Sequence, residues 1–288
     1  MIKNYGFIGL GDMGKPIVSN LLKSSKNIFV YDVDNIVNKA PSGSIICHSV
    51  KELVSNAEII FVSVPDGKAT KDVIDKILSS NFNLIKAIVN LSTIGFFETK
   101  PILEVLNKNN IIYIDAPVSG GKSGAIKGTI TIMWSGSEKL LEKIKKDLKY
   151  FSKSIFFIGK HPGQGQIMKL LNNYLSAVAM TATSEAILLG VKYKIDMKTI
   201  LDVLNVSTGK NSATLDKFPN RILTGTYDAA FKMELMYKDL QLYLTEARNS
   251  KLPVNIAEVT KEYFQEGVSE FSSGDFTEIY KVINKNKI

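Results

Sequence analysis

The sequence predicts an α/β protein in which a doubly wound, largely parallel sheet comes first and an all-helical part follows, joined by one long helix. Three observations support this prediction. Up to Gly159, short β-branched runs alternate with helical patterns. An apolar segment at 163–190 then predicts one long helix, and only helical periodicities follow it. At 288 residues the chain exceeds the usual domain of about 100–150 residues, so we expect two domains, 1–161 and 162–288.

Strands are expected where short apolar or β-branched runs end in turn residues. The strongest such run is 58–64, which Pro65 ends, and 44–47 is the weakest. The alternation of these runs with helical patterns is typical of βαβ units, whose strands are parallel. The expected strands are 4–9, 27–32, 44–47, 58–64, 87–91, 111–115, 129–134 and 154–158.

Helices are expected where apolar residues recur with a helical period between turn residues. Ser49 can cap one of them, with Glu52 three residues later completing a capping box. In the first part they are expected at 13–24, 49–56, 68–79 and 97–108 and between 134 and 154. In the second part they are expected at 163–190, 196–207, 212–223, 233–250, 254–267 and 275–284.

The charge distribution argues against nucleic acid as a partner. The chain has 36 basic and 28 acidic residues, a net charge of +8, but Arg221 and Arg248 are its only arginines. Residues 1–160 carry a net charge of +7 and residues 161–288 one of +1. Arg is the usual bidentate reader of guanine, so we do not expect a specific DNA reader. A mild basic excess favours an anionic metabolite.

Cysteine, histidine and hydropathy restrict the class further. One cysteine, Cys47, and two histidines, His48 and His161, predict neither an intramolecular disulfide nor a metal site. The N-terminus lacks a signal-peptide layout, and no apolar run approaches the ~20 residues that a membrane helix needs. We therefore expect a cytoplasmic protein that binds neither a metal nor a membrane.

A glycine-rich turn follows the first expected strand and opens the first expected helix. Its first glycine permits a tight turn, its second lets the backbone approach a pyrophosphate, and its third lets helix and strand pack closely. The helix N-terminus adds free N–H groups and a positive dipole end. This context predicts a dinucleotide site, with a purely structural turn as the alternative. The residues are Gly9, Leu10, Gly11, Asp12, Met13 and Gly14.

Asp32 ends the second expected strand and bears on the choice of cofactor. A carboxylate there accepts hydrogen bonds from the adenosine ribose hydroxyls and repels the 2′-phosphate of NADP. No Arg follows Asp32, and Lys39 is the nearest basic residue. We therefore expect NAD as the cofactor. NADP stays possible because Lys39 could take the role of the Arg.

A second glycine-rich segment follows the expected strand at 111–115, at the edge of the sheet where ligands bind in doubly wound folds. Ser119 offers a hydroxyl group there. Gly120 and Gly121 have no side chains, so their N–H groups can approach a carboxylate. An ordinary glycine-rich turn is the alternative.

Lys169 and Asn173 lie four residues apart, and hence on one face of the long apolar helix. Burying a lysine is costly unless it meets an anion or transfers a proton, which suggests acid–base chemistry. Asn173 could bind the lysine amine or a substrate hydroxyl. The alternative is that Lys169 extends to solvent. Lys238, in a later helical segment, could add a positive charge for a carboxylate or be an ordinary surface residue.

Four segments, in this order, resemble the β-hydroxyacid dehydrogenase family over nearly the whole chain. The glycine-rich turn at 9–14 is the first. The second segment, 115–125, matches the family signature Asp-Ala-Pro-Val-Ser-Gly-Gly-x-x-Gly-Ala. The third, 163–173, matches the family motif Gly-x-Gly-x-x-x-Lys-x-x-Asn-Asn, and the fourth, 238–240, matches its Lys-Asp-Leu. Asn90, Phe96 and Trp134 depart from the common residues of the family, Asp, Pro and Val.

The resemblance implies a role for each matching residue. Lys169 would be the catalytic acid/base, and Asn173 and Asn172 would orient the substrate. Ser119, Gly120 and Gly121 would hold the substrate carboxylate. Lys238 would lie near both nicotinamide and substrate. The cofactor would also meet the residues that follow two of the strands, namely Val64, Pro65 and Thr93.

The expected activity is hydride transfer between a nicotinamide cofactor and a small 3-hydroxy acid/semialdehyde pair, of the 3-hydroxyisobutyrate dehydrogenase type. Two alternatives remain open. One is an NADPH-dependent reductase of glyoxylate or succinic semialdehyde within the same family. The other is a non-catalytic module that senses the cofactor. Because the family usually assembles, we also expect a homodimer or homotetramer.

Overall fold

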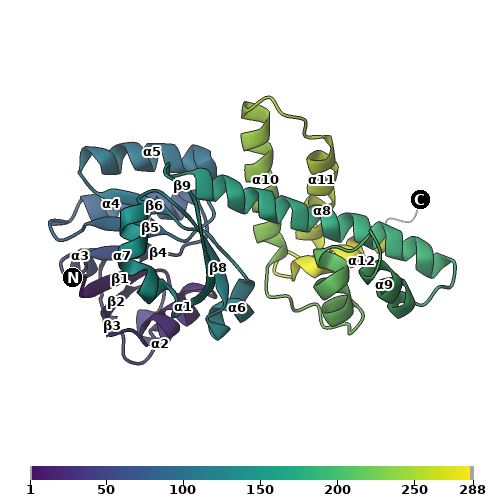
Figure 1. Ribbon diagram of the computed structural model, residues 1–288, viewed down its shortest axis with the longest axis horizontal. Coiled ribbons are helices and arrows are strands. Elements are labelled where there is room, and N and C mark those ends of the chain that lie inside the picture. The colour runs from purple at the N-terminus through teal and green to yellow at the C-terminus, as the bar shows by residue number, and fades with distance from the viewer. Residues whose placement is uncertain (1, 286–288) are drawn as a thin grey trace. The chain divides into compact units, whose positions relative to one another are not determined.

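The computed structural model describes residues 2–285. It divides into two compact units, Met1–Lys169 and Leu170–Ile288. Figure 1 shows a sheet with helices in the first and helices alone in the second. The fold is therefore α/β followed by all-α, as predicted.

The first unit is built on one sheet in the order β3-β2-β1-β4-β5-β6-β8-β7, with β9 paired to β8. β1 to β6 run parallel to their neighbours in the 3-2-1-4-5-6 order of Rossmann-type folds. β8 is antiparallel to β6 and β7 and parallel to β9. The strands are β1 Asn4–Ile8, β2 Asn27–Tyr31, β3 Ile45–Ile46, β4 Ile59–Val62, β5 Ala87–Asn90, β6 Ile112–Asp115, β7 Val118–Ser119, β8 Ile130–Ser135 and β9 Ser152–Gly159.

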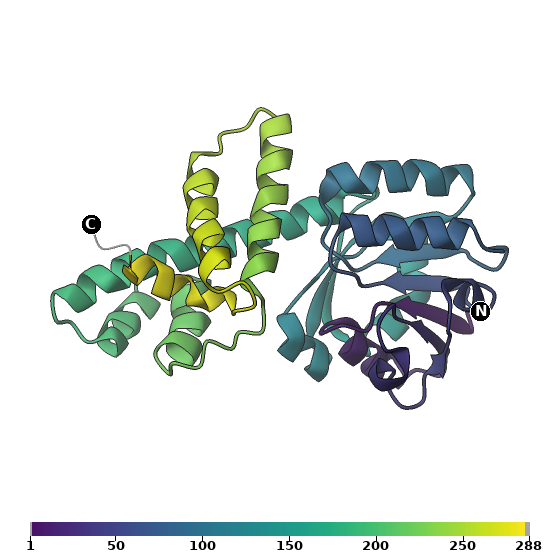
Figure 2. The same cartoon turned by 180° about the vertical axis from the view of Figure 1, so that it is seen from behind.

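Helices cover both faces of this sheet, as Figures 1 and 2 show. α2, α6 and β7 were not predicted. α2 is a single turn of four residues, too short to show a helical period, and β7 and α6 lie in a segment whose glycines and polar residues resemble a loop. Ser49 caps α3 by accepting from the Glu52 N–H, but the Glu52 carboxylate accepts from the His48 N–H, so only half of the expected capping box forms. The helices are α1 Gly14–Leu21, α2 Ile36–Lys39, α3 Val50–Val54, α4 Gly67–Leu78, α5 Gly95–Lys108, α6 Gly121–Lys127 and α7 Glu138–Leu148.

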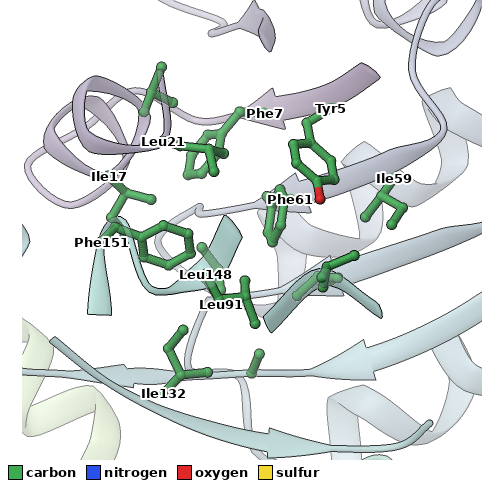
Figure 3. Close-up of a cluster of buried hydrophobic side chains, with 14 of the residues drawn as sticks. Tyr5, Phe7, Ile17, Leu21, Ile59, Phe61, Leu91, Ile132, Leu148 and Phe151 are labelled. Carbon is green, nitrogen blue, oxygen red and sulfur yellow. The ribbon is translucent and has the colours of Figure 1, made fainter. Parts of the chain in front are cut away.

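Alternating strand residues build two cores, one on each face of the sheet. Tyr5 and Phe7 of β1 face α1 and α7, and Ile8 faces α3, α4 and α5. Figure 3 shows the first core, where Phe61 lies edge-on to Tyr5 and to Phe151, with ring centroids 5.4 and 6.3 Å apart. Burying aliphatic and aromatic side chains stabilises by about 1.5–3 kcal/mol each, so both helix layers are firmly fixed to the sheet.

The second unit is helical and has a core of its own. Helix α8 begins at the end of the first unit and continues through the second. Met180 of α8, Phe218, Leu240 and Phe264 lie in one buried cluster. The segment expected at 212–223 is a π-helix. The elements are α8 Gln164–Lys192, α9 Met197–Asn205, η1 Ala213–Ile222, α10 Met233–Asn249, α11 Asn255–Glu270, η2 Phe276–Glu278 and α12 Ile279–Lys285.

Helix α8 corrects one expectation. Among the described residues it is the one helix long and apolar enough to cross a membrane, with a window of mean hydropathy 1.4 that is 33% buried. The prediction counted unbroken apolar runs, whereas isolated Thr, Ser and Gly residues lower the average of this window only slightly. Core helices of soluble proteins have the same length and composition, so this property is weak evidence for a membrane span.

Candidate active site

The loops after β1, β4, β5 and β6 lie along one edge of the sheet, because these strands are parallel neighbours. Hydrogen bonds join them in series: Ser63 N–H to Ile8 O, Leu91 N–H to Val62 O, and Ala116 N–H to Asn90 O. The Val64 N–H also donates to Ser92 Oγ at 2.9 Å. This edge therefore carries Val64, Pro65 and Thr93. These are the residues of the first unit predicted to contact the cofactor in addition to the glycine-rich turn and Asp32.

The glycines of the turn before α1 have different reasons to be glycine. Gly9 has a φ of +97°, and a Cβ there would collide with the Ser63 carbonyl oxygen. A Cβ on Gly14 would collide with the Gly9 carbonyl oxygen. At Gly11, by contrast, a Cβ would meet no atom of the described chain within 4 Å. The fold explains two glycines, and the open space at Gly11 fits the close approach of a dinucleotide pyrophosphate.

The remaining residues of the turn are held by neighbouring side chains. The Leu10 N–H donates to Asp32 Oδ2 at 2.6 Å. Asp12 is exposed and pairs with Lys122 of α6 at 2.6 Å. Met13 is half-buried and directly precedes α1. The turn is therefore fixed from β2 on one side and from α6 on the other.

Asp32 is 8% exposed and accepts three hydrogen bonds. Its Oδ1 receives Asp34 N–H and Lys39 Nζ, both at 2.8 Å, and its Oδ2 receives Leu10 N–H. Burial opposes ionisation, but the bonds from Lys39 and the two N–H groups outweigh it and lower the pKa of Asp32. An anionic acid thus stands at the end of β2, with a lysine beside it.

Ser119, Gly120 and Gly121 lie where β7 leads into α6. Ser119 pairs with Thr131 of β8, and the two glycines have positive φ angles of 123° and 60°. The Asp12–Lys122 ion pair joins the first turn of α6 to the glycine-rich turn. Within the first unit, the expected carboxylate-binding segment and the expected cofactor turn are therefore neighbours.

Lys169 and Asn173 are both buried, 7% and 5% exposed, one helical turn apart on α8. Asn172 Nδ2 donates to Asn173 Oδ1 at 2.9 Å. Asn173 Nδ2 in turn donates to Asp239 of α10. Asp239 Oδ1 also lies 3.3 Å from Lys238 Nζ. The second unit thus brings Asn172, Asn173 and Lys238 together around one buried carboxylate.

Sequence reasoning did not assign a role to Asp239, which is only 3% exposed. It also missed Asp115 and Gln166, both fully buried in the first unit. Burial raises the pKa of Asp115 to about 6, against the opposing effect of hydrogen bonds from Gln166, the Gly163 N–H and Tyr113. A signal existed for Asp115, which ends an apolar strand, whereas Asp239 follows Lys238 and resembles half of an ordinary surface ion pair.

No cluster of three or more His, Cys, Asp or Glu residues that could hold a metal ion is found between residues 2 and 285. The groups gathered at the edge of the sheet are glycine N–H groups, carboxylates and lysines. A Rossmann-order sheet with such a turn and an acid after β2 defines a dinucleotide-binding protein. A buried lysine on α8 adds a group suited to acid–base work. Together they are typical of nicotinamide-dependent oxidoreductases.

Comparison with known proteins identifies the family. The profile of the NAD binding domain of 6-phosphogluconate dehydrogenase matches residues 4–159. A second profile, described as the NAD-binding of NADP-dependent 3-hydroxyisobutyrate dehydrogenase, matches residues 163–283. The chain belongs to the β-hydroxyacid dehydrogenase family. It is an NAD(P)-dependent oxidoreductase that acts on CH–OH groups.

Individual relatives agree with this assignment. The 2-(hydroxymethyl)glutarate dehydrogenase of Eubacterium barkeri is 32% identical, covering 91% of this chain and 88% of that enzyme. The 2-hydroxy-3-oxopropionate reductase of Escherichia coli is 31% identical, covering 90% and 89%. A Mycobacterium tuberculosis 3-hydroxyisobutyrate dehydrogenase solved with L-serine has the same fold, with a TM-score of 0.89 at 23% identity over 98% of this chain and 99% of that one.

Proposed function

We propose that this enzyme interconverts a small 3-hydroxy acid and its semialdehyde, with Lys169 as the acid/base. The observation that carries the proposal is the burial of Lys169 on the same helical face as Asn173, within a matched family motif. When bound, the nicotinamide supplies or accepts the hydride. In reduction, the Lys169 ammonium donates its proton to the oxygen of the former carbonyl group, and in oxidation the neutral amine takes the proton back.

The other residues would orient the substrate. The Ser119 hydroxyl and the N–H groups of Gly120 and Gly121 would bind its carboxylate, since glycine N–H groups can approach an anion closely. Asn173, held by Asp239, would present its amide to the substrate with Asn172 beside it. Lys238, which Asp239 also holds, would lie near the substrate and the nicotinamide.

For the cofactor, we propose NAD. Gly9, Leu10, Gly11, Asp12, Met13 and Gly14 would bind its pyrophosphate, and Asp32 its adenosine ribose. The lowered pKa of Asp32 keeps this group anionic at neutral pH, which favours ribose hydroxyls over a 2′-phosphate. Val64, Pro65 and Thr93 would line the path to the nicotinamide.

Lys169→Ala tests the acid/base role. Turnover should fall by at least ~100-fold, the usual scale of acid–base catalysis, while NADH still binds. Lys169→Arg should be equally slow, because a guanidinium keeps the charge but does not release its proton. Lys192→Ala, at the exposed end of the same helix, is the matched control and should behave as the wild type. Near-normal turnover of Lys169→Ala would refute the assignment.

The substrate class can be narrowed by a panel of 3-hydroxyisobutyrate, 3-hydroxypropionate, glycerate and 2-(hydroxymethyl)glutarate. The last acid is included because a 2-(hydroxymethyl)glutarate dehydrogenase is 32% identical to this chain. We expect turnover of at least one acid that carries its hydroxyl group on the β-carbon. Failure of all four acids with both cofactors would contradict the proposed substrate class.

A second candidate is an NADPH-dependent reductase of small semialdehydes or glyoxylate. Lys39, 2.8 Å from Asp32, favours it, because a lysine at this place can offset the carboxylate and attract a 2′-phosphate. Initial rates with NADH and NADPH at equal concentration decide between the candidates. A clear preference for NADPH would support the reductase. A non-catalytic sensor is disfavoured by membership of an enzyme family.

We further propose a homodimer or homotetramer. α8 and α11 carry exposed apolar residues around a hollow of about 350 Å³, among them Ile256 and Val259, which are 63% and 55% exposed. Exposed apolar surface of this kind marks an interaction site. Light scattering should give a mass above 31.8 kDa, and Val259→Glu should lower it. A monomeric wild type would refute the assembly.

We also propose that the boundary between the two domains lies after residue 161 and that the protein is cytoplasmic. The boundary would fall in the turn between β9 and α8, immediately before the second matched profile begins at residue 163. Related enzymes include ones named as mitochondrial, so the compartment is a separate question from the activity.

A further inference from the structure

We infer that Gln166 and Asp115 are positioning residues: they hold the first turn of α8, and Lys169 with it, against the carboxyl ends of β5 and β6. The inference rests on the proposed role of Lys169 and goes beyond it. It concerns two buried polar side chains that belong to none of the groups assigned so far to substrate, cofactor or proton transfer.

Gln166 uses both ends of its amide within the first unit. Its Oε1 accepts from the N–H groups of Ile94 and Gly95, at 2.9 and 3.2 Å, where α5 begins. Its Nε2 donates to Ser92 O and to Asp115 Oδ1, both at 3.0 Å. One fully buried side chain on α8 therefore holds the loop that follows β5 through three bonds and reaches β6 through the fourth.

Asp115 completes the anchor from the last position of β6. Its Oδ2 accepts the N–H of Gly163, the residue just before α8, and its Oδ1 accepts from Gln166 and from Tyr113 Oη at 3.2 Å. Asn90 Nδ2 donates to Tyr113 Oη at 3.0 Å. The carboxylate is fully buried, and burying a charge is costly unless donors surround it. Here two of the donors, Gly163 and Gln166, lie at the start of α8, and the third, Tyr113, lies on β6 itself.

The glycines at the start of α8 make this close contact possible. A Cβ on Gly165 would lie 2.6 Å from the Met133 carbonyl oxygen and 3.1 Å from Ser135 Oγ. The Gly165 N–H donates to that Oγ at 2.9 Å. A Cβ on Gly163 would collide with the Phe96 ring. The first turn of α8 thus packs closely against β8 and against the start of α5.

This anchor bears directly on Lys169. Gln166 and Lys169 are three residues apart, so they lie on neighbouring positions of one helical face. A shift in the first turn carries the lysine with it. Since a misplacement of about 1 Å can cost a large factor in rate, the bonds made by Gln166 and Asp115 should act on the chemical step through Lys169.

A double-mutant cycle tests this coupling. Gln166→Met keeps the side-chain length and removes all four hydrogen bonds. At saturating NADH and semialdehyde, it should slow single-turnover reduction by about tenfold or more in the wild type, but by less than about twofold in Lys169→Ala, because residues that act as a unit are not additive. The dissociation constant of NADH, measured by titration calorimetry, should change by less than about threefold.

One control variant tests whether the loss of a side-chain hydrogen bond elsewhere in the first unit also slows the reaction. Tyr5→Phe removes a hydrogen bond between the start of β1 and Asp147 of α7, and it should leave the rate unchanged in both backgrounds. If Gln166→Met does not fold, Asp115→Asn takes its place in the cycle, since an amide cannot accept from both Gly163 and Gln166 without placing one donor against another.

The outcomes separate the inference from the proposed function. An equal loss of rate in both backgrounds means that Gln166 acts independently of Lys169, and it overturns the positioning role. If the loss appears only below saturating NADH, Gln166 acts on cofactor binding, and the positioning role is overturned too. A near-normal rate for Lys169→Ala alone removes the proposed acid/base, which is a different failure and is seen before any Gln166 variant is made.

Discussion

Two glycine-rich segments of the first unit, Gly9–Gly14 leading into α1 and Gly163–Gly165 at the start of α8, share the Gly-x-Gly pattern and differ in what they face. At Gly11 a Cβ would meet open space among the described residues. At Gly165 it would press on the Met133 carbonyl oxygen. The N–H groups of Gly163 and Gly165 are taken by Asp115 and Ser135. The first turn leaves room for a ligand, and the second docks a helix on the protein.

The difference teaches that a glycine motif alone does not distinguish a ligand site from a packing site. Both turns precede a helix, and both helix N-termini are favourable places for an anion. Before α8 the anion is a residue of the protein itself, Asp115. Before α1 the space for an anion lies outside the chain, and the profile match assigns this region to NAD binding. The atoms that surround each glycine show whether it belongs to a ligand site or to a packing contact.

The acids beside the turns sharpen this contrast. Asp32 has a lowered pKa because Lys39 and two N–H groups outweigh its partial burial. Burial dominates at Asp115 and raises its pKa to about 6, against the donors that surround it. One acid is therefore anionic at any physiological pH, and the other becomes neutral in mildly acid solution.

The largest expected effect is the pH dependence of stability due to Asp115. Its pKa rises from 3.8 to about 6 on folding, so below 3.8 the group is neutral in both states. As the pH rises toward 6, the unfolded chain loses this proton more readily, and the folded state loses up to about 3 kcal/mol. Urea unfolding of the wild type and of Asp115→Asn should therefore give a free-energy difference that moves against the wild type between pH 4 and pH 7. A difference that does not vary with pH would contradict the raised pKa.

Gly165→Ala should be next in size and should act on stability. The new Cβ would lie 2.6 Å from a backbone oxygen, and overpacking of this kind costs about 1–3 kcal/mol. The better helix propensity of Ala returns at most about 1 kcal/mol. Unfolding in urea at pH 7 measures the loss. Wild-type stability for this variant would mean that the start of α8 can move away from β8, and the contrast between the two turns would fail.

Much of this fold could be predicted because its signals are local. Alternation of strand and helix patterns located β1, β2, β4, β5 and β6 to within a few residues, and the turn before α1 indicated a dinucleotide. α6 and β7 were missed because a run of Gly, Ser and Lys resembles a loop, and their structure depends on packing against β8. The π-helix at 213–222 has no local signature that periodicity detects.

The site divides in the same way. Lys169, Asn173 and Ser119 stand in motifs of a known family, so they could be proposed from the sequence. The bond between Gln166 and Asp115 spans 51 positions, and that between Asn173 and Asp239 spans 66. Such pairs depend on the three-dimensional path of the chain, which spacing does not encode. Only burial in the fold shows that these polar side chains must be satisfied.

Gly11→Ala probes the other turn and should reverse the pattern seen at Gly165. With open space around the new methyl group, the free energy of unfolding should change by less than about 0.5 kcal/mol. The methyl group would occupy the approach of the pyrophosphate, and the dissociation constant of NADH should rise about tenfold, or about 1.4 kcal/mol. Calorimetric titration measures it. Unchanged affinity would show that Gly11 does not face the cofactor.

The smallest expected effect is that of Lys39→Ala on cofactor choice. Lys39 is 32% exposed in its pair with Asp32, and exposed pairs contribute only about 0.2–1 kcal/mol. Removing it leaves the Asp32 charge uncompensated, so the ratio of the NADPH and NADH dissociation constants should rise about two- to fivefold. Lys71→Ala, which breaks the exposed pair with Asp75 on α4, is the matched control and should leave this ratio unchanged. The effect should shrink in 1 M salt because exposed charges are screened. A ratio that does not move, or that falls, would show that Lys39 does not attract the 2′-phosphate, and Asp32 alone would then set the preference for NAD.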